Sequence, residues 1–365
     1  MAPTAVTEQA PATRARISRA ASLAELRDGW DGLAEGAGHP FGTWEWVNAW
    51  WQTYGEGREL FVHAVHDADG RLAAILPLYA SGRAGLRVGR FIGYADLHSP
   101  LCAEADRPLA ARALRGLLGS GPDRCSALLL EKLPGEQRWG ELVGGSLVKT
   151  DSDPVLGLAG RSWEDYEATL SSKLRKKSRY ERRRLERDHD VSFELCTEPG
   201  ELDRAMDELI ALHEARFGDE STGIFAGERA EMQRRVAAAA LDRGWLRLWV
   251  ERVDGTAAAA YYGIRFAGSE FFFQSGRDPA FDRLSVGSVL LMHVIRDACD
   301  AGIDDFRFLA GDESYKLKLA DEERHPETRL IAANRALEGL GGAFARHVWG
   351  MPSERRARLM GLIGR

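Results

Sequence analysis

Four ionisable side chains stand close together in residues 311–316, directly after a predicted buried strand. Ligands of open α/β sheets bind beyond the carboxyl ends of strands, so this run is a candidate active segment. If an amine is the attacking group, Asp312 or Glu313 could accept the proton it loses, and Tyr315 could protonate the leaving group. Lys316 could pair with a phosphate or with a substrate carboxylate. A structural interpretation is equally open, in which Asp312 caps a short helix and Tyr315 packs.

A second candidate is the start of a helix at Ser285-Val286-Gly287-Ser288. Apolar residues recur beyond it on one helical face as far as Ala298, and Ser285 takes the N-cap position. The first N–H groups of a helix lack partners within it and carry partial positive charge, so they can bind phosphate. Gly287 would let a ligand approach the backbone, and either serine hydroxyl could add a hydrogen bond. The plainer alternative is an ordinary N-cap on a core helix.

Four further side chains are candidate binding residues. Gln274 ends the aromatic strand before this helix, and Arg277 follows in the loop; we expect the first beside a cofactor and the second beside a substrate. Asp96 and His98 lie in a loop, residues 94–100, after another predicted strand. If two domains face each other, that loop would reach the cleft between them; otherwise it is a solvated turn.

The segment Lys173–Arg187 holds nine Lys and Arg residues against two acids, Glu181 and Glu186. Few apolar residues recur on it, so most of this predicted helix should be wet and basic. It is either a solvated helix between domains or an anion-binding face for a nucleotide, a tRNA or a polysaccharide phosphate. Tyr180 is its one aromatic residue, which argues against single-strand binding.

The whole chain, 365 residues, has a net charge of −6, so an anionic partner must meet a local patch. Its four cysteines show no metal-ligand spacing and predict buried thiols in a reducing cytoplasm. No apolar run reaches the roughly 18 residues of a membrane span. No metal cluster, nucleophilic triad or Gly-Lys-Ser/Thr phosphate loop is present. We therefore predict a cytoplasmic protein with no metal and no membrane partner.

One order of elements, strand-helix-helix-strand-strand, occurs twice, and each copy ends in a hairpin with an Asp-Gly turn. Its first copy is Ala15–Ser18, Leu23–Leu33, Thr43–Tyr54, Leu60–Val65 and Leu72–Leu76; its second is Val191–Cys196, Leu202–Phe217, Glu228–Arg243, Leu246–Val250 and Ala257–Tyr262. The repeat indicates a duplication. In the first copy the next helix, Leu109–Leu118, lacks a Gly/Ser phosphate loop. We infer that the second copy carries the cofactor.

This order resembles the GNAT acyltransferase fold. Several strings are similar to the acyltransferases grouped with the cellulose-biosynthesis protein CelD, which are related to Fem-type tandem-domain enzymes. They are Leu174-Arg175-Lys176-Lys177, Ser275-Gly276-Arg277-Asp278, Ser285-Val286-Gly287-Ser288-Val289-Leu290-Leu291, Gly311-Asp312-Glu313-Ser314-Tyr315-Lys316 and, in the first half, Trp44, Trp50-Trp51 and Leu76-Pro77-Leu78. The resemblance covers about residues 20 to 335 and implies acyl transfer to an amine. It also implies that Tyr315 protonates the leaving thiolate, as a tyrosine near this point does in many GNAT enzymes.

One string departs from the GNAT pattern. The usual pyrophosphate loop reads Gln/Arg-x-x-Gly-x-Gly/Ala, whereas Arg283 here stands four residues before Gly287. The resemblance therefore leaves two donors open. An acyl-CoA such as acetyl-CoA would serve an N-acyltransferase acting on a small-molecule, glycan or peptide amine. An aminoacyl-tRNA held by the basic helix would serve a Fem-like transferase. A third alternative is a non-catalytic binding module for a polysaccharide or assembly system.

We predict an α/β fold with tandem GNAT-like domains, the first degenerate and the second catalytic. The predicted limits are a disordered arm (residues 1–15), an N-terminal GNAT-like domain (16–160), a basic helical linker (161–190), a C-terminal GNAT domain (191–338) and a basic tail (339–365), either helical or loose.

Overall fold

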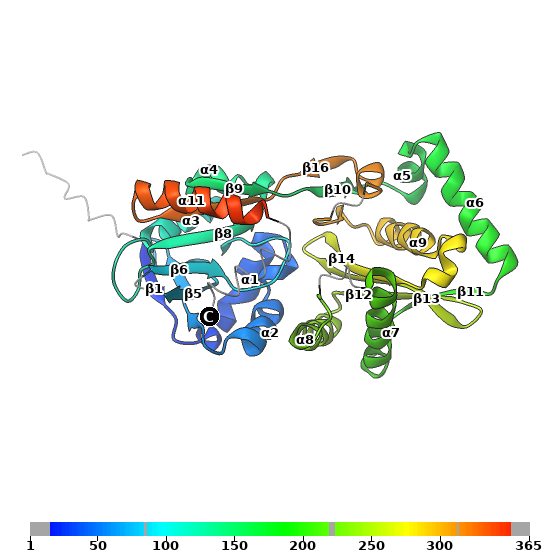
Figure 1. Ribbon diagram of the computed structural model, residues 1–365, viewed down its shortest axis with the longest axis horizontal. Coiled ribbons are helices and arrows are strands. Elements are labelled where there is room, and N and C mark those ends of the chain that lie inside the picture. The colour runs from blue at the N-terminus through cyan, green and yellow to red at the C-terminus, as the bar shows by residue number, and fades with distance from the viewer. Residues whose placement is uncertain (1–14, 84–85, 219–222, 312–313, 352–365) are drawn as a thin grey trace, which may run out of the picture.

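The computed structural model describes residues 15–83, 86–218, 223–311 and 314–351. The predicted arm up to residue 14 and the predicted tail from residue 352 lie outside the described residues. The described chain forms two lobes that lie side by side (Figure 1). Each lobe combines β-sheet with covering helices, so the predicted α/β class is confirmed.

The first lobe holds two sheets, with strand orders β1-β3-β4-β7 and β2-β5-β6-β8-β17-β9. Its elements up to residue 150 are β1 (Arg16–Arg19), α1 (Arg27–Ala37), α2 (Trp44–Tyr54), β2 (Glu59–Leu60), β3 (His63–His66), β4 (Leu72–Leu76), β5 (Leu78–Arg83), β6 (Leu86–Phe91), β7 (Leu101–Cys102), α3 (Arg107–Gly116), β8 (Ala127–Leu133), α4 (Trp139–Val143) and β9 (Ser146–Thr150), with short 3-10 helices η1 (Leu23–Leu26), η2 (Pro40–Gly42), η3 (Glu104–Asp106) and η4 (Gly135–Gln137). The β3–β4 hairpin turns at the predicted Asp69-Gly70 pair.

The second lobe holds one sheet, with strand order β11-β12-β13-β14-β15-β10-β16. Its elements are β10 (Asp153–Gly157), α5 (Trp163–Thr169), α6 (Ser172–Asp188), β11 (Val191–Leu195), α7 (Pro199–Phe217), α8 (Glu228–Asp242), β12 (Leu246–Val253), β13 (Thr256–Phe266), β14 (Ser269–Arg277), η6 (Pro279–Leu284), α9 (Val286–Asp300), β15 (Asp305–Arg307), α10 (Lys316–Leu319) and β16 (Glu322–Arg324). The β12–β13 turn has φ of 50° at Asp254 and 79° at Gly255, as a type I′ turn requires. Helices α5, α6 and α9 cover one face of this sheet, and α7 and α8 cover the other.

The chain crosses between the lobes more often than the sequence predicts. Strand β17 (Glu327–Ala332) falls within the predicted C-terminal domain but pairs with β8 and β9 of the first lobe. Its buried Ile331 packs among apolar residues there, while the polar β16 takes the edge of the second sheet. In return, β10 lies inside the second sheet between β15 and β16. The second lobe takes β10 from before residue 160, and the first lobe takes β17 from after residue 191. The predicted domain limits at residues 160 and 191 therefore stay a proposal.

Helix α11 (Arg335–Trp349) also belongs to the first lobe, although it comes last in the described chain. Ala345 and Val348 are buried, and the Arg346 side chain donates to the carbonyl of Leu147 on β9. The start of the predicted basic tail is thus a packed helix, which was one of the two forms predicted for it.

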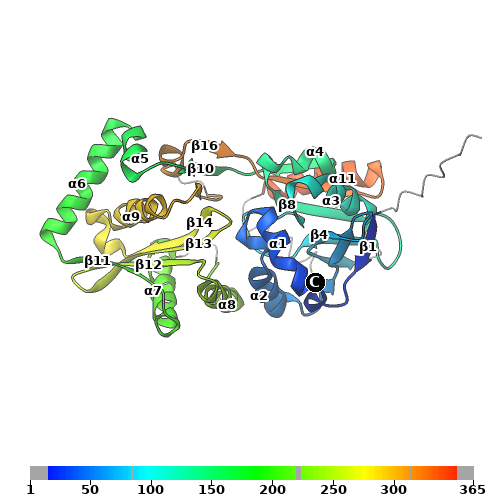
Figure 2. The same cartoon turned by 180° about the vertical axis from the view of Figure 1, so that it is seen from behind.

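One apolar core continues across the junction of the lobes. The rings of Phe41 and Trp46 from the first lobe lie 5.9 and 5.2 Å from that of Phe273 on β14. Helices α1 and α2 face α8 (Figure 2), where Arg243 forms ion pairs with Asp31 and Glu45. The two lobes are therefore held in a fixed relation by burial and by charge.

Strands β14 and β15 run parallel but pair over three residues only, Ser269–Phe271 with Asp305–Arg307. Strand β15 then ends, whereas β14 continues along β13 to Arg277. A register shift gives β14 one extra residue at Phe273, because Phe272 and Gln274 pair with neighbouring residues of β13. Such bulges bend a strand and re-aim its side chains. The strand pair therefore opens toward its carboxyl end.

Candidate active site

The first turn of α9 stands at the open end of this strand pair. Ser285 takes the N-cap position, as predicted, with φ of 59°, but its side chain does not cap the helix. Its hydroxyl instead donates to Glu181 Oε1 at 2.8 Å. A Cβ on Gly287 would lie 3.4 Å from Cδ of Arg277, so the Arg277 side chain lies against this turn. The structure thus brings three of the predicted binding residues, Ser285, Gly287 and Arg277, together.

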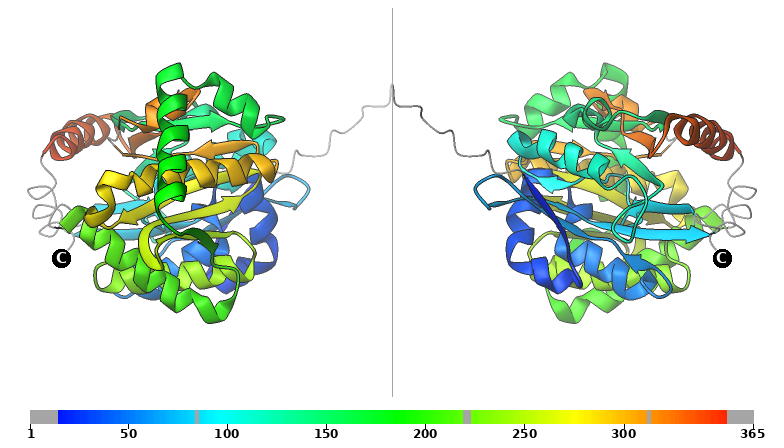
Figure 3. Two further views of the ribbon diagram at one scale, coloured as in Figure 1. Left: turned by 90° about the vertical axis from the view of Figure 1, so that its right-hand side faces the viewer. Right: turned by 90° about the vertical axis from the view of Figure 1, so that its left-hand side faces the viewer.

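The basic helix α6 runs across α9 on the outer face of the second lobe (Figure 3). Leu185 and Leu174 pack into the core there, and Arg184 donates to the carbonyl of Arg283. Lys177 lies 3.6 Å from the same Glu181 oxygen that accepts from Ser285. Positive side chains therefore surround the first turn of α9, but a buried carboxylate already lies among them.

The segment after β15 holds the other group of predicted site residues. Leu309 has a left-handed φ of 57°, which is rare for a non-glycine residue. Lys316 is 6% exposed; its Nζ donates to the carbonyl of Ala310 at 3.3 Å and lies 5.9 Å from the centre of the Phe272 ring. Tyr315 is half-buried against the α9 side of the core. The predicted Asp312 and Glu313 lie outside the described residues.

These two groups share one edge of the sheet. Because β14 and β15 are parallel, their carboxyl ends point the same way, toward the first turn of α9. Phe272, below Lys316, packs in the same cluster as Val286 of that turn. A buried lysine side chain beyond β15 can stabilise negative charge that develops on a carbonyl oxygen, and the first turn of a helix such as α9 can bind an anion.

Gln274 lies apart from this group. It pairs with Tyr262 across β13 and β14, and directly paired residues share a face of the sheet. The Tyr262 hydroxyl donates to Gln233 of α8 at 3.3 Å. Gln274 is therefore on the α7–α8 face, opposite α9.

Asp96 lies near the junction of the lobes, where its carboxylate accepts from Lys132. Burial lowers the pKa of Lys132, but the charge of Asp96 outweighs it, so the pKa lies above its usual value. The Lys132 ammonium is therefore charged and has the Asp96 carboxylate as its partner. Asp96 has no direct contact with the α9 or Lys316 groups in the part of the chain that the structure describes.

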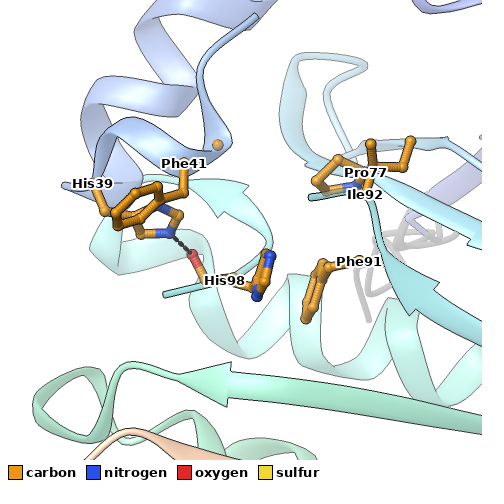
Figure 4. A pocket seen from close by; sticks show the side chains of 8 residues that line it. His39, Phe41, Pro77, Phe91, Ile92 and His98 are labelled. Carbon is orange, nitrogen blue, oxygen red and sulfur yellow. Dashed lines mark hydrogen bonds between the residues drawn. The ribbon is translucent and has the colours of Figure 1, made fainter. Parts of the chain in front are cut away.

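His98 is buried in the first lobe, stacked parallel on Phe91 in a pocket too narrow for a water molecule (Figure 4). His39 lies nearby, and its Nε2 is 3.0 Å from the Ser99 hydroxyl. Burial lowers the pKa of His39 to about 3 and that of His98 to about 4; Arg307 and Lys132, respectively, act in the same direction. Both rings are neutral near pH 7. The structure gives His98 a packed position and no solvent-facing cleft.

The sequence prediction missed three side chains. Glu181 stood out only as one of two acids in a basic run, yet it contacts the α9 turn. Arg307 is 4% exposed and binds Asp153 of β10 and Glu136 of η4. An arginine between two phenylalanines in a strand predicted to be buried was the available signal, because buried charges need partners. The third missed side chain, Asp153, had no such signal in the sequence.

Across the described residues, no group of three or more His, Cys, Asp or Glu side chains is placed to hold a metal ion. The described helices include none that is both long and apolar enough to cross a bilayer. All four cysteines are buried and free of disulfides.

Residues 172–317, from α6 to the start of α10, match the model of the acetyltransferase (GNAT) domain family. No curated protein matches the chain in sequence. The match covers the α9 turn, Arg277 and Lys316, and so places the candidate site within a GNAT domain. The closer likeness to CelD-type proteins rests on the sequence strings alone.

Three solved structures share the fold over most of the chain. The structure of FemX aligns with a TM-score of 0.61 at 10% identity, covering 89% of this chain and 100% of that one. The C-terminal domain of a putative lysylphosphatidylglycerol synthetase from Agrobacterium fabrum gives 0.54 at 14% identity, with 88% and 95% covered. The L-PGS structure from Bacillus licheniformis gives 0.52 at 12% identity, with 83% and 95% covered. The predicted tandem GNAT-like α/β fold is confirmed.

Proposed function

From a GNAT domain with this geometry, we propose that the protein is an N-acyltransferase that moves an acyl group from acyl-CoA to an amine. The observation that carries the proposal is the opening between β14 and β15, which has the first turn of α9 and Arg277 on one side and Lys316 on the other. Donor phosphates would bind at Ser285–Ser288 and Arg277, and the acyl group would lie toward Lys316.

The reaction is a direct transfer without a covalent enzyme intermediate. The amine nitrogen attacks the thioester carbonyl carbon, the new C–N bond forms and the C–S bond breaks. The nitrogen gives up a proton, and the thiolate takes one up. The Lys316 ammonium would stabilise the carbonyl oxygen while it carries negative charge.

Tyr315 is our candidate for the group that protonates the thiolate, and Asp312 or Glu313 for the group that accepts the amine proton. Tyr315 adjoins Lys316 in the chain and is half-buried, so it is near the proposed reaction and partly accessible. A phenol hydroxyl beside the departing thiolate can donate a proton to it.

Calorimetric titration of the protein with acetyl-CoA tests the proposal. We expect saturable binding, weakened at least about tenfold by Gly287→Asp, because a carboxylate there would repel the donor phosphates. The substitution should be tolerated by the fold, since a Cβ on Gly287 meets only Arg277 at an ordinary contact distance of 3.4 Å.

Gly200→Asp is the matched control. Gly200 also lies in the first turn of a helix, α7, and a Cβ there meets nothing within 4 Å. This variant should bind like the wild type. Absence of binding by the wild-type protein at millimolar acetyl-CoA would reject the acyl-CoA proposal.

One observation favours a second candidate, a Fem-like transfer from aminoacyl-tRNA. Helix α6 places the Glu181 carboxylate at the α9 turn, which disfavours a phosphate there, while the same helix presents many exposed cations. Lys173, Lys176 and Arg183 are exposed and form no ion pair within the described chain. A tRNA backbone would bind to such a surface.

A filter-binding assay with aminoacyl-tRNA separates the two donors. The tRNA candidate predicts binding that weakens steeply with salt and is lost when Lys173, Lys176 and Arg183 are all changed to Glu. These three residues, unlike Arg182 and Arg184, support no contact of α6 with the lobe, so the fold should survive. Retention of tRNA by this variant would reject the second candidate.

A further inference from the structure

We propose that Asp153 is a positioning residue for the reaction: it holds the backbone after β15 in the form that places Lys316 beside Phe272. The inference rests on the proposed function for its kinetic consequence, but its structural content can be tested without any substrate. Asp153 comes from β10, which reaches the second sheet from the first half of the chain.

The two carboxylate oxygens of Asp153 have different partners. Oδ1 accepts from the backbone N–H of Leu309 at 3.0 Å. Oδ2 accepts from Nε of Arg307 at 3.0 Å and also from its Nη2. Asp153 is 1% exposed, so these bonds are made away from water. One side chain therefore fixes both the last residue of β15 and the backbone two residues later.

The hydrogen bond to Leu309 falls where the backbone needs support. A left-handed φ, here 57°, is unfavourable for leucine and persists when the surroundings determine it. Next to Leu309 is Ala310, whose carbonyl accepts from Lys316 Nζ at 3.3 Å. The Phe308 N–H also donates to the carbonyl of Pro154 at 2.9 Å, which ties the same segment to β10. Asp153 thus acts on Lys316 through a two-residue backbone step.

The first lobe takes part in this arrangement. Glu136 of η4 accepts from Nη1 of Arg307 at 2.9 Å. Glu136 is more exposed than the buried Asp153–Arg307 pair, and it has no hydrogen bond to Leu309. The exchange of β10 between the lobes therefore gives the first half of the chain a role at the candidate site without contact with the substrate.

Two double variants isolate the hydrogen bond to Leu309. Asp153→Leu/Arg307→Met removes both charges, so no unpaired charge is left buried, and it also removes the acceptor for Leu309. Asp153→Asn/Arg307→Met removes the same charges but keeps an oxygen that can accept from Leu309. Leu and Asn are similar in size, so the pair differs mainly in that acceptor.

The readout is the rate at which sulfo-NHS-acetate acetylates each lysine, followed by mass spectrometry. Lys318, exposed on the same short helix, is the internal reference, and Lys132 reports whether the first lobe stays folded. We expect Lys316 to react at least about fivefold faster in the Leu/Met variant than in the Asn/Met variant, which should match the wild type within about twofold. A purely structural ion pair predicts equal acetylation rates for Lys316 in the two double variants. That result would overturn the proposal.

A kinetic comparison connects this result to the reaction. For the donor that the wild type uses, the Leu/Met variant should lose about tenfold in kcat with KM changed less than twofold, and the Asn/Met variant should recover most of the loss. Equal kcat values would overturn the positioning role. A wild-type protein that transfers no acyl or aminoacyl group would reject the proposed function, while the lysine rates would still decide the role of Asp153.

Discussion

The lobes of this protein treat the same junction of strand and helix in opposite ways. Each lobe holds a parallel strand pair with a helix between its strands: β6, α3 and β8 of the first lobe correspond to β14, α9 and β15 of the second, and each pair is parallel over three residues. Beyond the paired residues, the chain after β6 lies beside β8, where the N–H of His98 donates to the carbonyl of Lys132 at 3.1 Å. Strands β14 and β15 stay paired at their first three residues and then separate. The loop that carries His98 fills the gap in the first lobe, and the second lobe leaves the corresponding gap open.

Helices α3 and α9 also differ in how their first turns are formed. Helix α3 directly follows the 3-10 helix η3, and Pro108 in its first turn has no N–H. Helix α9 begins at a left-handed residue, Ser285, and carries Gly287 in its first turn beside Arg277. The same order of elements therefore forms a packed scaffold in one lobe and the candidate site in the other, and the difference lies in how the gap beside the strand pair is filled and how the next helix begins.

The largest effect we predict concerns a buried acid of the second lobe. Glu251 is 0% exposed, neither carboxylate oxygen has a hydrogen-bond partner in the described structure, and burial raises its pKa to about 8, although Arg182 opposes this. The folded protein then binds a proton that the unfolded chain releases near its usual pKa of 4.5. Stability should fall as pH rises from 4.5 to 8, by at most on the order of 5 kcal/mol.

Glu251→Gln removes this titration, so its stability relative to the wild type should increase between pH 5 and pH 8. Guanidinium unfolding at both pH values measures the change. The first lobe supplies a control, Glu56→Gln, which removes an exposed acid that forms no ion pair among the described residues. If the difference in the free energy of unfolding between the wild type and Glu251→Gln does not change with pH, Glu251 is not buried in a protonated state.

The next effect concerns Lys316 of the second lobe. The packed region of the first lobe around His98 also holds a lysine, Lys132, which pairs with Asp96. Lys316→Met keeps the length of the side chain and removes the charge. We expect kcat/KM to drop about 100-fold, as loss of one group that stabilises a developing oxyanion typically causes. Lys318→Met, exposed on the same helix, should stay within about twofold of the wild type. A Lys316→Met variant with nearly the wild-type kcat/KM would show that the charge of Lys316 takes no part in the mechanism.

The smallest effect concerns Glu181 at the start of α9. Glu181→Gln keeps an oxygen for the Ser285 hydroxyl but removes a negative charge from beside the proposed phosphate site. We expect acetyl-CoA to bind about fivefold more tightly, which corresponds to about 1 kcal/mol. Glu186→Gln, which loses an ion pair with Arg182 on the same helix, is the control. Unchanged or weaker binding would show that the phosphate does not approach this carboxylate.

Local patterns predicted the elements well. The Asp-Gly turns, the paired helices and the N-cap at Ser285 follow from turn chemistry and helical periodicity, which act over a few residues. Local patterns could not predict the exchange of strands between the lobes, because the sequence of β17 is typical of a buried strand whichever sheet it joins. The contacts of Glu181 and Asp153 were missed for the same reason: each depends on a partner more than 100 residues away.

Hydrogen exchange with and without saturating acetyl-CoA tests the contrast between the lobes most directly. If the second lobe alone holds the donor, amides of residues 286–289 at the start of α9 should exchange about tenfold more slowly with acetyl-CoA. Amides at the start of α3, residues 107 and 109–110, should not change, because that helix start is occupied by chain. Protection at α3, or no protection at α9 despite saturating acetyl-CoA, would contradict the account.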